Sequence, residues 1–107
     1  MSKGISTGGF HDIPTTVNLS GSIIDWAQSD VFNHNISSDT TYSFLNDTDG
    51  RIIVLKITNT TASPLNLTWP ASFVNPDVTI AANSTKIITL VKILSQIFSL
   101  TPTATFP

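Results

Sequence analysis

Short runs of alternating apolar and polar residues follow one another from Thr15 onward, separated by turn-forming residues. A period of two is the pattern of a β-strand with one buried face. Short strands repeated at this spacing are typical of a β-sandwich or small barrel. The strands expected on this basis cover 16–19, 31–36, 41–45, 51–58, 65–69, 78–80, 86–94 and 97–100. We therefore expect an all-β fold, a small antiparallel β-sandwich or jelly-roll-like unit.

The run 51–58 is the clearest strand, and it is apolar on both faces. Its odd-numbered apolar residues share one face, while Ile52 and Val54 place apolar groups on the other. Such a strand is usually central in its sheet, or lies between a core and a subunit contact. Two tryptophans in a small β domain usually serve as core or interface anchors. Ile52, Val54, Trp26 and Trp69 are therefore the residues expected at a subunit interface.

Two earlier runs have one apolar face each. The side chains expected to share such faces within 31–36 and 41–45 are Phe32, His34, Ile36, Tyr42 and Phe44. Between 41–45 and 51–58, the sequence Asn-Asp-Thr-Asp-Gly predicts a tight turn, because Asp and Gly tolerate left-handed backbone conformations.

The segment 86–100 fits two periods. Its apolar residues also follow the i, i+3, i+4, i+7 spacing of an amphipathic helix, at Ile87, Leu90, Val91, Leu94, Ile97 and Phe98. Against a helix stand the β-branched run 87–89 and the absence of a capping box. We favour strands here and keep a helix as the alternative.

Residues 1–14 are rich in Gly, Ser and Thr, and such segments seldom fold alone. We expect an N-terminal arm, with a frayed terminus as the alternative. The side chains available to anchor this arm on another particle protein are Ile5, Phe10 and Ile13. The β domain then covers 15–100, and 101–107 forms a tail of mainly Pro and Thr.

Composition sharpens this picture. Charged residues make up 11% of the chain, against about 25% in a typical soluble domain. A surface this poor in charge suggests that other subunits cover much of it. The net charge of −2 offers no electrostatic basis for binding nucleic acid or an anionic membrane. The chain has no cysteine, which excludes disulfides and zinc–thiolate sites.

Targeting signals are not apparent either. The first residues lack the apolar core of a signal peptide. The longest apolar stretch, 87–100, is interrupted by Thr, Lys, Ser and Gln and does not predict a transmembrane span. We expect the protein to be made in a cytoplasm and kept there until it is assembled.

Candidate chemistry is sparse. His11 and His34 are the two imidazoles, and neither has a His or carboxylate at ligand spacing. The sequence 47–50 resembles a calcium loop, but Leu45 and Lys56 stand where an EF-hand needs oxygen ligands. A weak surface calcium site stays open as a minor alternative. We expect no catalytic residue, no structural metal and no cofactor.

The aromatic residues allow two interpretations. Trp26, Tyr42 and Trp69 could form a platform on which sugars stack, although core or interface packing is more usual for such rings. The two interpretations differ in whether the rings face solvent.

The order of signals resembles a β-rich module of tailed-bacteriophage virion proteins, which occurs in head fibres, decoration proteins and tail or baseplate appendages. The resemblance covers roughly residues 16–95. It rests on Asp25-Trp26, Val31-Phe32, the Thr-rich stretch 40–44, the run 49–55, the Leu-Thr-Trp-Pro-Ala sequence at 67–71, and 86–90. The family continues its late strand through an Asp-Gly type hairpin into an aromatic strand, whereas this chain has Lys-Ile-Leu-Ser-Gln-Ile-Phe at 92–98.

The resemblance implies a homotrimer without catalytic residues. The expected function is that of a virion structural protein, a head-fibre or decoration-type subunit held to capsid or tail proteins by its N-terminal arm. The alternative is a tail-fibre or baseplate module that binds a receptor or carbohydrate on the host surface. Either protein would reside in the virion after synthesis in the host bacterial cytoplasm.

Overall fold

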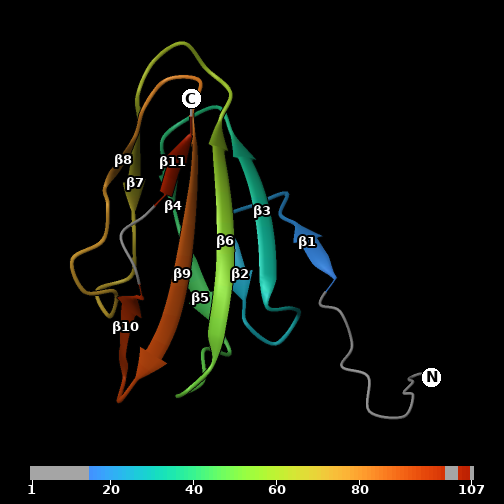
Figure 1. Ribbon diagram of the computed structural model, residues 1–107, viewed down its shortest axis with the longest axis vertical. Helices are drawn as coiled ribbons and strands as arrows, with labels where there is room; N and C mark the ends of the chain where they lie inside the picture. The colour runs from blue at the N-terminus through green and yellow to red at the C-terminus, as the bar shows by residue number, and fades with distance from the viewer. Residues whose placement is uncertain (1–14, 101–103, 107) are drawn as a thin grey trace.

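The computed structural model describes residues 15–100 and 104–106, and these residues form strands and turns without any helix (Figure 1). The all-β prediction is confirmed. No described segment is therefore a helix long and apolar enough to cross a membrane. The strands are β1 Thr16–Asn18, β2 Ile23–Asp25, β3 Val31–Ile36, β4 Thr40–Thr41, β5 Ser43–Leu45, β6 Ile52–Asn59, β7 Leu65–Thr68, β8 Thr79–Ile80, β9 Thr85–Ile93, β10 Gln96–Ser99 and β11 Ala104–Phe106.

A six-stranded sheet, the large sheet, is the main element of the fold. Its order is β1-β3-β6-β9-β10, and β11 also pairs with β9. Two smaller sheets, β2-β5 and β4-β7-β8, lie behind the large sheet in the view of Figure 1. The strand β11 falls within the range 101–107 that the sequence assigns to a tail, while the predicted arm 1–14 lies outside the described residues.

The expected antiparallel arrangement is wrong for part of the fold, because the sheets are mixed. Strands β1, β3 and β6 run parallel, as do β2 with β5 and β4 with β7. Parallel neighbours need a crossover of about a dozen residues or more. The connections 19–30 and 37–51 supply these crossovers, and they place β2, β4 and β5 in the smaller sheets before the chain returns to the large sheet in the same direction.

The core lies against the inner face of the large sheet, the face that packs on the two smaller sheets. Ile53 and Leu55 of β6 are fully buried, and they pair with buried Leu90 and Ile88 of β9. The expected apolar face of β3 is confirmed by the burial of Phe32, His34 and Ile36. Tyr42 is also buried, and Phe44 packs against the core while remaining partly exposed.

The segment 86–100 forms a β-hairpin, so the helical alternative is wrong. Strand β9 pairs along its length with β6 and turns back into β10, with Ile93 opposite Gln96. A helix could not satisfy the backbone of β6, whose peptide groups need a neighbouring strand. Here long-range pairing and β-branched side chains outweigh the helical spacing of the apolar residues.

Candidate assembly surface

The single described imidazole is a core residue. The ring of His34 is buried, and its Nδ1 lies 2.9 Å from the Tyr42 hydroxyl. Burial lowers the pKa of His34 and raises the pKa of Tyr42, since desolvation disfavours the charged form of each group. His11 lies outside the described residues. Within 15–100 and 104–106, no three His, Cys, Asp or Glu residues come together as metal ligands.

The aromatic residues form an interior cluster. Trp69 stacks on Tyr42 with ring centroids 4.6 Å apart, and its indole N–H donates to the Asp77 carbonyl at 2.8 Å. Trp26 is fully buried and meets the edge of Phe44, with the ring centroids 5.7 Å apart. These rings therefore cannot form an exposed sugar-stacking platform without a rearrangement of the core.

This burial also bears on the expected interface, which stays a prediction. Trp26 has no exposed surface in the single chain, and Trp69 is 9% exposed. Their large apolar rings are used by the fold of one chain, so they have almost nothing to offer a second subunit. Of the four residues expected at an interface, Ile52 and Val54 alone keep appreciable exposed surface.

The carboxylate of Asp25, beside Trp26, serves local structure. The Asp25 carboxylate accepts hydrogen bonds from the Asn46 amide at 2.8 Å and from the Ala27 N–H at 2.9 Å. The first of these contacts contributes most to lowering the pKa of Asp25. The Asp-Trp pair thus ties the end of β2 to the end of β5 and points the indole inward.

The predicted turn at 46–50 is confirmed. Gly50 has a φ of 84°, and its N–H donates to the Lys92 carbonyl at 2.7 Å. The Asp47 carboxylate lies 3.4 Å from the Lys92 ammonium. These residues therefore link the turn to the end of β9, close to the β9–β10 hairpin.

The outer face of the large sheet, opposite the core, carries apolar side chains alongside polar ones such as Asn33, Thr58 and Thr89. Pairing places Ile52 opposite Val91 and Val91 opposite Phe98, so one apolar row crosses three strands. Val31 and Val54 form an adjoining pair. Among the described side chains of this face, Lys56 is the one charged group. Ile52 and Ile93 are about half exposed, Val91 is buried, and the other apolar side chains are partly exposed. We define the outer face by its apolar members Val31, Ile52, Val54, Ile87, Val91, Ile93 and Phe98.

The hairpin tip, residues 93–96, extends this surface beyond the sheet. Leu94 is 81% exposed and Ile93 is 49% exposed. Leu94 and Ser95 have φ angles of 49° and 70°, so both central residues of the turn are left-handed. Two-residue hairpins of this kind strongly favour Asn-Gly or Asp-Gly. A leucine at this position is therefore strained as well as exposed.

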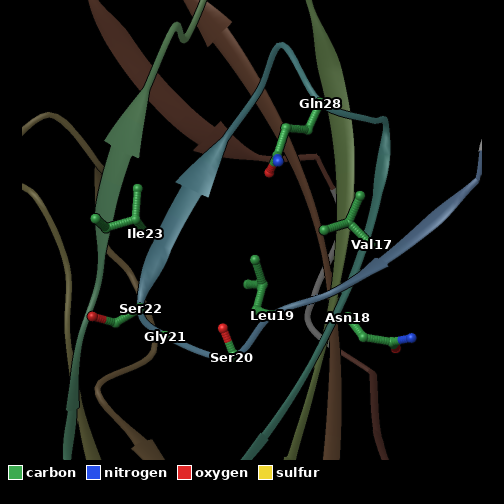
Figure 2. A pocket seen from close by; sticks show the side chains of 8 residues that line it. All are labelled: Val17, Asn18, Leu19, Ser20, Gly21, Ser22, Ile23 and Gln28. Carbon is green, nitrogen blue, oxygen red and sulfur yellow. The ribbon is translucent and has the colours of Figure 1, made fainter.

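At the opposite edge of the large sheet lies a groove of about 410 Å³ between β1 and β2. Figure 2 shows the apolar side chains of Val17, Leu19 and Ile23 around a common space. We call this the edge groove, and its polar lining includes Ser20, Ser22 and Gln28.

Comparison of the chain with protein-family models, curated proteins and solved structures gives no match. The residues expected to anchor the arm, Ile5, Phe10 and Ile13, lie outside the described residues. Sequence reasoning did not identify the edge groove. It also missed the row of Val91 and Phe98 beside Ile52, since that row exists only once the strand register is known.

Proposed function

We propose that the chain is a structural subunit of a bacteriophage virion, of the head-fibre or decoration type, which works by associating with copies of itself. The observation that carries this proposal is the set of apolar side chains on the outer face of the large sheet, of which Ile52 and Ile93 are about half exposed. The core is complete without that face, because the inner face of the same sheet packs on the smaller sheets. Surface left apolar on one side of a folded domain is typical of an interaction site.

The size of the outer face suits a subunit interface. Strand β9 has nine residues, and at about 3.3 Å per residue it is about 30 Å long. Five strand positions lie side by side across the sheet, and at about 4.8 Å each they span about 24 Å. Since the edge strands β1 and β10 have only three and four residues, the face covers at most about 700 Å², which approaches the ~800 Å² that each partner buries in a standard interface.

The low charge of the face favours copies of the same chain as partners. When two identical charged faces meet, like charges come close together and destabilise self-association. Here the apolar rows carry no charge, and Lys56 lies away from the Ile52–Val91–Phe98 row. In a homotrimer of sandwich-like subunits, the three outer faces can meet around one symmetry axis. Closed symmetry then buries this surface in every subunit.

Attachment to capsid or tail proteins through Ile5, Phe10 and Ile13 completes the proposal. It follows from the resemblance to phage virion modules and from the position of 1–14 ahead of β1. The glycan-binding alternative is not proposed, because the Trp26, Tyr42 and Trp69 rings that it requires at the surface are buried.

Sedimentation of the purified full chain tests the self-association. We expect a trimer at micromolar concentration, and Ile52→Lys should weaken it at least tenfold by placing a charge in the apolar row. Val78→Lys is the matched control, since Val78 is 57% exposed but lies outside the large sheet. A wild-type chain that sediments at 11.5 kDa throughout this range would contradict the proposal. Immunogold electron microscopy of particles of the phage that encodes the chain tests the virion location, and unlabelled particles would contradict it.

A further inference from the structure

We propose that the hairpin tip of one copy inserts into the edge groove of the next copy, so that subunits join head to tail in a closed ring. This inference rests on the proposed self-association and specifies a contact through which it occurs. The occupant of the groove is thus a second copy of this chain, with Leu94 as the inserted side chain.

The tip has properties that the fold of a single chain does not explain. Leu94 is the most exposed of the large apolar side chains in the described structure, at 81%. It occupies a left-handed backbone position that Asn or Gly adopts at lower free-energy cost. Elsewhere in the described chain, the non-glycine residues at positive φ are Asn, apart from Ser95 beside it. A leucine at a position that both solvation and backbone disfavour indicates a contact made outside the chain.

The groove complements the tip in chemistry. Val17, Leu19 and Ile23 supply apolar walls, and Ile23 is 55% exposed in the single chain. Burying an aliphatic side chain among them removes apolar surface from water on both partners. Around this centre, the hydroxyls and amide of Ser20, Ser22 and Gln28 can exchange hydrogen bonds with Ser95 and Gln96 at the tip.

Neither surface carries a charge. The tip is Ile-Leu-Ser-Gln, and the groove lining is made of apolar residues, Ser, Gly, Asn and Gln. Insertion therefore buries no unpaired ion, and so avoids the large desolvation free energy of a buried charge. The nearest lysine, Lys92, is already paired with Asp47.

The two surfaces also lie at opposite edges of one sheet. Strands β1 and β10 end the order β1-β3-β6-β9-β10, and they appear on opposite sides of the molecule in Figure 1. A contact between different patches on two copies is heterologous, and it produces a ring when the rotation closes. A ring of three would join these edges and leave the three outer faces free to meet at its axis.

The decisive variant replaces the turn by its preferred sequence, Leu94→Asn with Ser95→Gly. It removes the exposed Leu94 side chain and relieves the left-handed strain, so the hairpin itself becomes more stable. We expect the unfolding midpoint of the dilute, dissociated chain to rise, while the dissociation constant for self-association increases at least tenfold. A purely structural turn would show the first change without the second.

The matched control is Val78→Asn, which removes an exposed apolar side chain that belongs neither to the tip nor to the groove lining. It should leave the association unchanged. If the turn variant associates as tightly as wild type, tip insertion is wrong, while self-association through the outer face stands. If the wild-type chain is itself monomeric, the proposed function and this inference are both wrong.

Cross-linking locates the contact directly, because the chain has no cysteine of its own. Mild oxidation of Ser22→Cys/Ser95→Cys should give disulfide-linked trimers on a non-reducing gel, since groove rim and tip face each other across each contact. The control Ser38→Cys/Ser95→Cys places its first thiol in an exposed turn outside the groove and should remain unlinked. Equal linking of the two variants, or linking of neither in a chain that still sediments as a trimer, would overturn the inference.

Discussion

The two faces of the large sheet differ in what covers them, although both carry Ile side chains on β6 and β9. On β6, Ile53 is fully buried against the smaller sheets, while its neighbour Ile52 is 48% exposed on the outer face. The inner face is covered within one chain, whereas part of the outer face stays exposed in the single chain. The comparison shows that an apolar strand position has two possible uses, and that its exposure in the single chain separates them.

The adjacent isoleucines give the largest expected difference. Ile53→Ala should lower the free energy of unfolding by about 2–5 kcal/mol, because it leaves a cavity in the core. Ile52→Ala should lower it by less than about 1 kcal/mol in the dissociated chain, since the side chain stays half in water. Urea unfolding at low protein concentration measures both. Equal losses would show that the outer face is part of the same core.

The buried pair of His34 and Tyr42 tests how far the stability of the core depends on satisfied hydrogen bonds. Tyr42→Phe removes the hydroxyl that lies 2.9 Å from the His34 ring and leaves that nitrogen buried without its partner. We expect the free energy of unfolding to fall by about 1–3 kcal/mol. Thr41→Val alters the exposed neighbouring residue and is the control. No loss in the Phe variant would mean that the imidazole finds another partner.

Acidification should lower the free energy of unfolding through the same histidine, His34. Burial lowers the pKa of His34 in the folded chain below its ordinary value of 6.5. Above pH 6.5 the ring is neutral in both states. Below it the unfolded chain takes up a proton that the folded chain excludes, so stability decreases until the pH reaches the folded-state pKa, with a slope of at most about 1.4 kcal/mol per pH unit.

Unfolding at pH 7.5 and pH 5.5 measures this effect. In His34→Gln the decrease between the two values should disappear, because glutamine cannot take up the proton. A variant that keeps the full decrease would assign it to another group.

The smallest expected effect concerns charge beside the outer face. Asp30 and Arg51 form an ion pair of 2.8 Å, and both side chains are substantially exposed. Asp30→Asn should change the free energy of unfolding by at most about 1 kcal/mol, with less change at high salt. A larger loss in thermal unfolding would indicate that this pair does more than join the starts of β3 and β6.

The sequence predicted the strands well where one period dominated. Alternation identified the buried residues of β3 and the two-sided character of β6, because a pleated strand sends successive side chains to opposite faces. Turn chemistry likewise located 46–50, where glycine supplies a left-handed conformation. The sequence of 86–100 fitted both periods, and only pairing with β6 decided in favour of strands.

The candidate surface was predicted in part. Ile52 and Val54 were identified because their strand is apolar on both faces. Trp26 and Trp69 were assigned to the interface on residue type alone, yet residue type does not reveal which partner covers a large ring. The edge groove draws on β1, β2 and Gln28, whose side chains meet only after the chain has crossed between sheets.

By itself, the sequence determined that this protein is built of strands, which side chains alternate within them, and that little charge protects its surface. These are local properties, set by backbone geometry and residue chemistry. Tertiary structure decided the parallel pairing of β1, β3 and β6, the burial of both tryptophans and the joining of Ile52, Val91 and Phe98 into one apolar row on the outer face. Register and crossover direction depend on contacts between distant segments, and the alternation within one strand is the same whichever neighbour it meets.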